Sequence, residues 1–560
     1  QIFGQDVSNI MPETQIPLNT KSASGFPLSD LGDLPVDGQQ YAVQAVLIPY
    51  TLYNRSDGHR LWLPDWNTYT YSSDSDDYGW SEDDRPGHTW GARSGPSMCG
   101  SFYSPVEIVD FRIHSDQLLK ITRMVPTRPA SPPETKYAKR LEMKSERLSS
   151  FWGRAVFIAA WVLLPYGWHD RKDARYPVVI NHGHYSHQAW RGWAQEAPPE
   201  VVTPADLDNA DTCYYCSTTG CLHDCQSDSF DQLYAYHFAR NWTSSREESA
   251  FSHRRVLLVR LQHQNPFYDD SYAVNSANLG PYGDAITYEL LPAIERRFRG
   301  IGQPWARMLV GGSTGGWASL AAQIKYPDEY GGAWGNAPDP VDFHAFSTLN
   351  LYQSENAYYN AFERKMGPFL QVPIPAKRSY LGTLISSQHQ VCQYESALGS
   401  RSRSGGQYAI WAAVFGPVGE DGYPASPWDV VTGQINHTVL EHWRNNFDLV
   451  DILKRNWAKG LGSKLQGKLH AYVGSMDNFY LDTAVFRMQN FLDSPAVQPP
   501  ARAEFRYGTR HGRGYNHAWS GDNTTSMRVN DLTLFQRLVP MMVDLMLSDA
   551  PAGADVTSWR

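Results

Sequence analysis

The stretch that decides the fold is Val310-Gly311-Gly312-Ser313-Thr314-Gly315-Gly316-Trp317, which closes an apolar run at 308–310 and precedes a segment with helical spacing. A serine on a tight turn from strand to helix needs glycines two positions before it and two positions after it, because a Cβ there would collide with neighbouring backbone. Gly311 and Gly315 meet this need. The stretch therefore has the pattern of a nucleophile elbow with Ser313 at its tip, and its surroundings distinguish that pattern from a plain glycine-rich loop.

Short apolar runs alternate with helical stretches on both sides of the elbow. Further strands are expected at 469–473 and 503–507, and the apolar runs lie at 156–164, 177–180, 256–259 and 308–310. They are nearly continuous, as in strands covered on both faces, which favours a largely parallel sheet. Helices are expected at 286–298 with a stop at Gly300, at 317–325, at 480–492 and at 532–547. The elbow thus occupies a strand-turn-helix, and we predict an α/β-hydrolase fold with a mostly parallel sheet flanked by helices.

The length of the chain, 560 residues, predicts more than one hydrophobic core or large insertions. Residues 1–40 are expected to form an extended arm, and 41–150 a β-rich domain that ends in a proline-rich, charged linker from about 126. The hydrolase domain is expected at 151–560. Within it, residues 342–459 are rich in aromatic side chains and include a late helical run at 438–459, so they are expected to form a cap insertion.

A serine hydroxyl needs a histidine base, and the histidine needs a carboxylate that fixes its tautomer. In this fold the chain order is serine, acid, histidine. Asp477 directly follows the strand at 469–473, and His517 lies in a glycine-rich loop beyond the strand at 503–507. We predict these two as acid and base, with Asp482 and His511 as the alternatives.

An oxyanion hole needs two backbone N–H groups, one from the residue after the serine and one from the loop after an earlier strand. Thr314 supplies the first. His184 or Tyr185 supplies the second, because His-Gly after the strand at 177–180 lets the chain turn its N–H groups inward. The other interpretation makes His182, His184 and His187 metal ligands, but we predict no metal and no cofactor.

Cysteine usage indicates disulfides. Four cysteines share one polar stretch, and two lie far from it: Cys213, Cys216, Cys221 and Cys225, then Cys99 and Cys392. Two bridges within the stretch and a long-range third pair are expected. Zinc is the alternative, although the middle spacer is short for a zinc knuckle.

Several weak signals favour secretion. Four sequons for N-glycosylation begin at Asn54, Asn241, Asn436 and Asn523. The numbering opens at Gln1, as after removal of a signal peptide. Together with the even number of cysteines, these signals predict a secreted, extracellular protein.

Charge excludes some partners. A net charge of -9 and a pI near 6.1 give no basic surface for nucleic acid, and no block of like charge indicates a membrane surface. The longest apolar run, 155–165, is about half of what a bilayer crossing needs. An acidic loop at 65–89 lacks EF-hand spacing, so calcium binding there is the alternative to a solvated loop.

Five segments in order resemble the putative esterase family of α/β-hydrolases, which includes esterase D, feruloyl esterases, enterochelin esterases and mycolyl transferases. They begin at Tyr176, Asn275, Glu289, Gly311 and Tyr326. The similarity covers about 156–342 and 469–521, and it implies Ser313, Asp477 and His517 as nucleophile, acid and base. The chain departs from the family pattern at Asn516, where a glycine often stands, and in its long cap and cysteine loop.

The sequence therefore predicts a secreted serine hydrolase that cleaves a small-molecule or polymer-linked carboxylic ester through an acyl-enzyme. Its cap and three residues near the elbow, Pro281, Tyr282 and Trp317, are expected to shape the substrate pocket. The alternatives are an amidase, peptidase or acyltransferase with the same triad, and a non-catalytic carbohydrate- or surface-binding protein on a hydrolase scaffold.

Overall fold

A computed structural model gives the structure of this chain. It describes residues 1–18, 23–28, 33–34, 40–64, 100–110, 118–125, 131–186, 238–245, 247, 249–361, 371–379, 382–508, 517 and 531–560. The acidic loop at 65–89 and the cysteine-rich stretch lie outside these residues.

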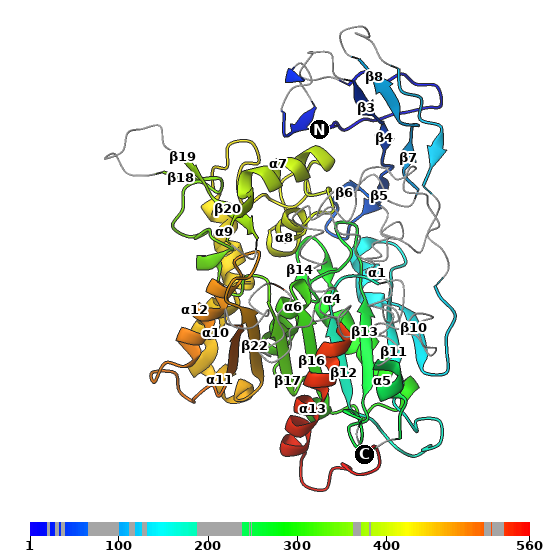
Figure 1. Cartoon of the computed structure of the whole chain (residues 1–560), viewed down its shortest axis with the longest axis vertical. Helices are drawn as coiled ribbons and strands as arrows, with labels where there is room; N and C mark the ends of the chain where they lie inside the picture. Colours follow the sequence, from blue (N-terminus) through cyan, green and yellow to red (C-terminus); the bar gives the residue numbers. More distant parts are fainter. Residues whose placement is uncertain are drawn as a thin grey trace, which may run out of the picture.

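An eight-stranded sheet forms the centre of the molecule (Figure 1). Its spatial order is β10 (Ala138–Lys144), β11 (Phe157–Leu163), β13 (Leu257–Gln262), β12 (Val178–His182), β16 (Arg307–Gly312), β17 (Gly332–Asn336), β22 (Leu469–Gly474) and β23 (Glu504–Gly508). The pairs from β13 to β23 are all parallel. Since consecutive parallel strands end at the same edge, the loops after β12, β16, β17 and β22 emerge side by side. The predicted α/β-hydrolase fold is confirmed.

The first two strands of the sheet are antiparallel, and one of them was not expected. β11 pairs antiparallel with β13, and β10 pairs antiparallel with β11. β10 lies in the charged stretch expected to be a linker. Its side chains alternate between the sheet and solvent, so an edge strand reads as a polar segment in the sequence. Part of the expected linker therefore belongs to the main sheet.

Helices flank the sheet (Figure 1). A continuous helical segment runs through α4 (Tyr282–Ala285), a π-helical turn (Ile286–Leu290) and α5 (Leu291–Phe298). It ends at Arg299, which takes the left-handed conformation with φ 62° that was expected of Gly300. α6 (Thr314–Lys325) packs against β12, β16 and β17. α12 (Asp482–Leu492) packs against β22, and α13 (Asp531–Asp549) closes the chain.

Residues 342–459 add hairpins and helices above the sheet. The hairpins are β18 (Tyr359–Ala361) with β19 (Gln371–Pro373), and β20 (Pro375–Arg378) with β21 (Leu384–Ser387). The helices are α7 (Gln388–Leu398), α8 (Gln407–Phe415), α9 (His437–Asn446) and α10 (Leu449–Asn456). The expected single run at 438–459 is broken because the Asp448 carboxylate accepts from Asp451 N and starts a new helix, α10. The bounds of the cap as a unit stay a prediction.

The N-terminal part is β-rich, as predicted. It contains β1 (Ile2–Gly4), β2 (Ser24–Phe26), β3 (Tyr41–Val43), β4 (Val46–Leu47), β5 (Thr51–Asn54), β6 (Arg60–Leu63), β7 (Phe102–Tyr103), β8 (Glu107–Val109) and β9 (Arg123–Met124). β1 and β2 lie beside α7 (Figure 1). Arg403, which is 6% exposed, fastens this part by an ion pair of 2.7 Å with Asp6 and by stacking on the Tyr50 ring.

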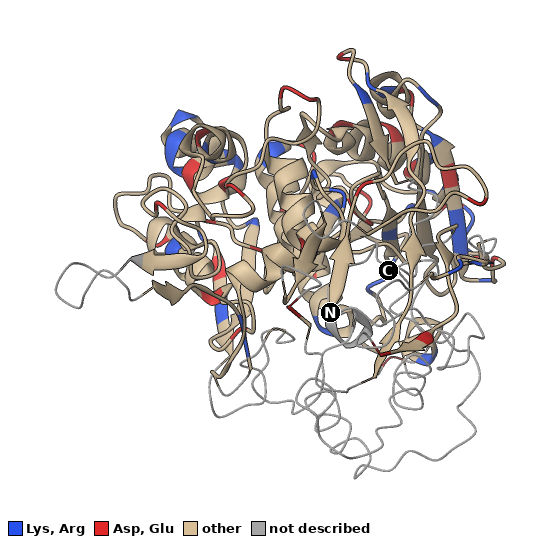
Figure 2. Ribbon diagram, turned by 90° about the horizontal axis from the view of Figure 1, so that it is seen from above, with Lys and Arg blue, Asp and Glu red and all other residues tan. Residues whose placement is uncertain are grey.

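Charged residues are mixed along the described ribbon (Figure 2). Basic and acidic segments alternate on the helices and loops seen from above. In the described part of the chain, none of the helices combines the length and the apolar character that a membrane crossing requires.

Candidate active site

Ser313 lies on a strained turn between β16 and α6. Its backbone has φ 54° and ψ -122°, a conformation that non-glycine residues rarely adopt. The two glycines that flank it leave no room for side chains. A Cβ on Gly311 would come within 2.3 Å of the Gly315 backbone, and a Cβ on Gly315 within 2.1 Å of the His182 carbonyl oxygen. The geometry is therefore that of the elbow predicted from the sequence.

Asp477 and His517 contact each other beside this turn. His517 Nδ1 lies 2.7 Å from Asp477 Oδ2, and the Asp477 side chain is fully buried. The other oxygen, Asp477 Oδ1, accepts from Phe479 N at 2.8 Å, so the carboxylate is held on both sides. The bond at Nδ1 fixes the tautomer that leaves His517 Nε2 as the basic nitrogen.

The carboxylate also sets the charge state of His517. Burial disfavours the imidazolium and lowers the pKa, but the charge and hydrogen bond of Asp477 outweigh it, so the pKa of His517 lies above its usual 6.5. Such a histidine takes up a proton readily, which is the property of a general base.

Asp482, the alternative acid, is engaged elsewhere. It begins α12 and lies 3.1 Å from Arg378 Nη2. Burial raises its pKa to about 6. In the structure His517 is paired with Asp477, while the alternative base His511 lies outside the described residues.

The Ser313 hydroxyl contacts a carboxylate that the sequence did not single out. Ser313 Oγ donates to Asp339 Oδ1 at 3.3 Å, whereas no hydrogen bond to His517 forms in the described part of the chain. Asp339 stands in the loop after β17, next to the elbow in the sheet. The one sequence signal for Asp339 is an acid just after a strand at the edge where the elbow emerges, but β17, with its glycines and one tryptophan, lacks the β-branched residues typical of a strand.

The two proposed parts of the oxyanion hole lie on neighbouring loops. Thr314 is the first residue of α6, where backbone N–H groups lack partners within the helix. His182, the last residue of β12, pairs with Gly311 of β16, so the loop that carries His184 and Tyr185 emerges beside the elbow. The donor role of each residue stays a prediction.

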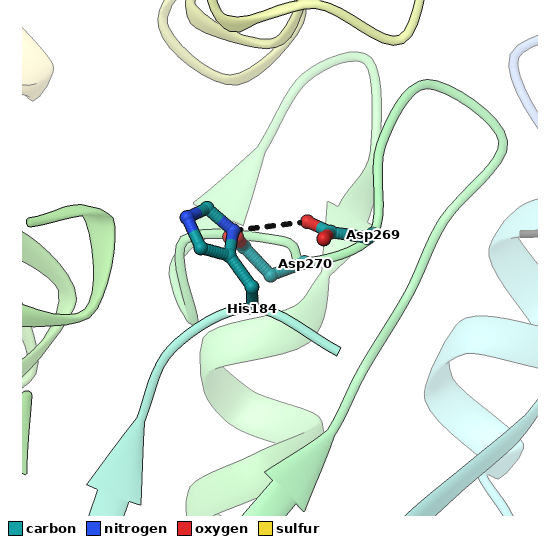
Figure 3. A group of neighbouring side chains, drawn as sticks. All are labelled: His184, Asp269 and Asp270. Atoms are coloured by element: carbon teal, nitrogen blue, oxygen red, sulfur yellow. Dashed lines mark hydrogen bonds and ion pairs between the residues drawn. The ribbon is translucent and has the colours of Figure 1, made fainter. Parts of the chain in front are cut away.

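The Nδ1 atom of the His184 ring faces two carboxylates (Figure 3). This atom lies 3.1 Å from both Asp269 Oδ1 and Asp270 Oδ2. These three donor atoms lie within 4.8 Å of one another, close enough to share a divalent cation. The same distances suit a histidine that donates to a carboxylate. In either case the contacts tie the loop after β12 to residues 269–270.

The residues expected to line the substrate pocket are largely internal. Tyr282 and Trp317 are fully buried, and Tyr282 OH donates to the Gln264 carbonyl at 2.8 Å. Pro281 ends β15 (Gly280–Pro281), which pairs with β14 (Asn275–Ser276). Trp317 packs edge-on against Tyr272. A direct substrate contact of these three residues stays a prediction.

One cysteine prediction is wrong. Cys392 has a free thiol, buried on α7 beside Tyr358, so the expected bridge to Cys99 is not formed. Its side chain points into the packed interior of residues 342–459, where burial also raises the pKa of the thiol. The other five cysteines lie outside the described residues.

Three of the four sequon asparagines are described. Asn54 ends β5, Asn241 lies at the edge of a short helix, and Asn436 caps α9 through a bond from Val439 N. Asn54 and Asn436 are exposed. Asn523 lies outside the described residues, and glycosylation stays a prediction at all four.

The β20–β21 hairpin is bonded to the loop that carries the acid. Arg378 Nε donates to the Asp477 carbonyl at 2.9 Å, and Arg378 N donates to the Asn478 carbonyl at 2.8 Å. The Asn478 side chain donates back to the Arg378 carbonyl at 3.0 Å and accepts from His517 N at 3.2 Å. Asn478 therefore connects the hairpin with the histidine.

Comparisons with solved structures give distant likenesses. A ferulic acid esterase is 13% identical with a TM-score of 0.33, over 73% of this chain and 99% of that chain. An S-formylglutathione hydrolase from Agrobacterium tumefaciens is 10% identical with a TM-score of 0.31, over 73% and 94%. A post-proline cleaving enzyme from Rickettsia typhi is 10% identical with a TM-score of 0.31, over 80% and 42%. Identities and TM-scores this low give no information on the substrate of this protein. None of the curated proteins compared with the chain matches it.

A family model gives the informative match. Residues 261–341 match the family described as putative esterase. The matched segment contains the elbow with Ser313, the helix α6 and the loop with Asp339. The resemblance predicted from the sequence is thus confirmed for this segment, which lies within an α/β-hydrolase fold.

Proposed function

We propose that this protein hydrolyses carboxylic esters through an acyl-enzyme formed on Ser313. The observation that carries the proposal is the Asp477–His517 contact of 2.7 Å at the edge of the sheet where the strained Ser313 turn emerges. Ser313 Oγ attacks the ester carbonyl and gives its proton to His517 Nε2, which passes it to the leaving alcohol. Water then enters by the same route and releases the acid.

The remaining parts of the mechanism stabilise charge. Asp477 orients His517 and supports its positive charge during attack. The N–H groups of Thr314 and of His184 or Tyr185 receive the oxyanion of the tetrahedral intermediate. The hydrogen bond between the His184 ring and Asp269, together with the nearby Asp270 carboxylate, keeps the second donor loop in place.

A fluorophosphonate probe, which reacts with activated serines, tests the proposal. Wild-type protein should be labelled, and Ser313→Ala and His517→Ala should not. Ser463→Ala is a matched control, because this serine is exposed on α11 (Leu461–Leu465), far along the chain from the elbow. Failure of the folded wild-type protein to react would overturn the proposal and favour a binding protein on a hydrolase scaffold.

A substrate panel separates esterase from amidase activity. p-Nitrophenyl esters of increasing acyl length should be cleaved, and the matching anilides should be cleaved far more slowly, because their leaving groups are poorer. Turnover of anilides or peptides without turnover of short esters would contradict an esterase.

Secretion is part of the proposal. It is supported by sequons at the exposed Asn54 and Asn436. Expression of the full-length gene product in its own cells, followed by glycosidase treatment of the medium and of the cell lysate, tests it. A product found in the lysate alone, with no shift in mass on treatment, would contradict secretion.

A further inference from the structure

A buried carboxylate that the mechanism above does not use lies against the nucleophile. Asp339 is 5% exposed. Its loop is bonded to the elbow, because Ser313 N donates to the Asn336 carbonyl at 2.9 Å and Asp339 N donates to the Ser313 carbonyl at 3.2 Å. A charge in such a place is costly unless donors surround it. The donors around Asp339 treat its two oxygens differently.

The Oδ2 atom of Asp339 accepts hydrogen bonds from four side chains. The Tyr272 hydroxyl donates to it at 2.5 Å. Longer contacts come from Gln407 Nε2 at 3.3 Å, Trp411 Nε1 at 3.3 Å and Thr314 Oγ1 at 3.4 Å. Trp411 Nε1 also donates to Tyr272 OH at 2.7 Å, and Gln407 donates to the same hydroxyl. Tyr272 is therefore held so that its own proton points to Asp339.

The Oδ1 atom faces the nucleophile. Of the hydrogen bonds made in the described part of the chain, Oδ1 of Asp339 takes one, from Ser313 Oγ at 3.3 Å. The carboxylate cannot turn its other edge toward Ser313 without giving up the bond from Tyr272. An acceptor is thus fixed beside the serine hydroxyl, and two of the groups that fix it, Gln407 and Trp411, come from α8 of residues 342–459.

We propose, building on the serine esterase function above, that Asp339 is a positioning residue: its Oδ1 holds the Ser313 hydroxyl in the free enzyme, and its charge supports the imidazolium that forms on His517 during attack. During attack the Ser313 hydroxyl turns its proton from Asp339 Oδ1 to His517, so the proton that Ser313 loses goes to His517 and then to the leaving alcohol. Asp339 keeps no proton at any step, so the reaction balances as before. Gln407 and Trp411 of α8 contact Asp339, and Asp339 contacts Ser313. The inserted segment at 342–459 is therefore connected to the nucleophile through this carboxylate.

The charged groups that face His517 in the described residues come from three elements. Asp477 of the acid loop and Asp339 after β17 raise the pKa of His517, and Lys377 of β20 lowers it, while burial opposes the charged form. Loss of the Asp339 charge therefore lowers the pKa of His517. The acid limb of the reaction, where His517 becomes protonated and inactive, then moves to lower pH.

Asp339→Asn tests the proposal because the donors around Oδ2 decide how the new amide turns. Its oxygen must take the place of Oδ2, where the Tyr272 hydroxyl donates. Its NH₂ group then faces Ser313 Oγ and donates where a carboxylate accepted. The rate constant of fluorophosphonate labelling should fall about 10- to 100-fold, as expected for loss of one charged hydrogen bond, and its acid limb should move to lower pH.

Asp448→Asn is the matched control. Asp448 is also fully buried and also accepts from a tyrosine hydroxyl, that of Tyr352 at 2.7 Å, but it lies at the start of α10, outside the site. This variant should lose thermal stability and keep the wild-type acid limb. A shift of the limb in Asp339→Asn that is absent from Asp448→Asn supports positioning, whereas wild-type rate and limb in Asp339→Asn would overturn it.

Tyr272→Phe decides the question if Asp339→Asn does not fold. It removes the strongest donor to Oδ2 and keeps the ring, which packs against Trp317 and Phe415. Labelling should slow while the acid limb stays in place, because the charge remains; labelling at the wild-type rate would overturn the proposal. If the wild-type protein itself is not labelled, the serine esterase function fails instead, so the two failures are distinguishable.

Discussion

The carbonyl oxygen of His182 lies 2.1 Å from the point that a Cβ on Gly315 would occupy. Strand β12 and the first turn of α6 therefore meet backbone to backbone, with no side chain that can move aside. This contact holds the elbow against the end of β12, just before the loop that carries His184 and Tyr185, the residues proposed to give the second oxyanion donor.

Gly315→Ala should be strongly destabilising, by about 3 kcal/mol or more, because overpacking against rigid backbone exceeds the usual cost of an added methyl group. The protein should also lose fluorophosphonate labelling. Urea unfolding measures the first effect. Gly312→Ala is the comparison, since its Cβ would come no closer than 3.8 Å to any neighbour, and it should unfold at the wild-type urea midpoint. Equal stability of the two variants would contradict the close contact.

The pH dependence of activity follows from His517. Its pKa is raised above 6.5, chiefly by Asp477 acting against burial, and the neutral imidazole is the active form. kcat/KM should therefore rise with pH and reach half of its maximum above pH 6.5. The same group stabilises the fold below pH 6.5, and this contribution is lost as the pH rises through the higher, folded value. A half-maximum of kcat/KM below pH 6.5 would show that the effect of Asp477 on the pKa of His517 does not outweigh that of burial.

Replacement of each of the two candidate acids by asparagine should have very different effects on kcat. Asp477→Asn should lower kcat by roughly three to four orders of magnitude, as expected for a serine triad whose histidine loses its orienting carboxylate. Asp482→Asn should keep most of kcat, because Asp482 contacts Arg378 instead. Steady-state kinetics on a p-nitrophenyl ester measure both. A larger loss of kcat in Asp482→Asn than in Asp477→Asn would assign the role of the acid to Asp482.

Glu395 should make stability depend on pH. It is 7% exposed, and burial raises its pKa from 4.5 to about 7 in spite of bonds from Tyr408 N and Ala409 N at the start of α8. A group with a raised folded pKa stabilises fully below pH 4.5, and that contribution, about 3 kcal/mol at most, is lost as the pH rises through 7.

Glu395→Gln should remove this dependence. The difference in Tm between pH 5 and pH 8 should be smaller in the variant than in the wild-type protein. Glu146→Gln is the comparison, because Glu146 is 76% exposed, and its Tm difference should match that of the wild type. An unchanged difference in Glu395→Gln would show that the carboxylate is ionised throughout.

The sequence predicts the elements whose signal is local. The elbow can be predicted because its pattern, from Gly311 through Ser313 to Gly315, lies within five residues of sequence. Asp477 and His517 can be predicted because each follows a strand of the sheet, and parallel strands bring their loops to one edge. These features depend on short stretches and on a topology rule.

The features that the sequence hides depend on packing between distant segments. The contacts of Asp339 come from Tyr272 and from Gln407 and Trp411 of α8, two segments that are far apart in the chain. β10 is hidden because one of its faces is charged. The free thiol of Cys392 could not be foreseen from the count of cysteines, since only the fold shows that its side chain is enclosed.

The bonds between Arg378 and the acid loop limit how this protein can be redesigned. A chimaera that replaces the β20–β21 hairpin would remove the donors to the Asp477 and Asn478 carbonyls and free the Asn478 side chain that holds His517 N. Exchange of the hairpin to alter substrate range therefore also changes the surroundings of His517, the proposed base. A graft that keeps Arg378 and joins the new segment beyond it preserves the base while the rest of the insertion varies.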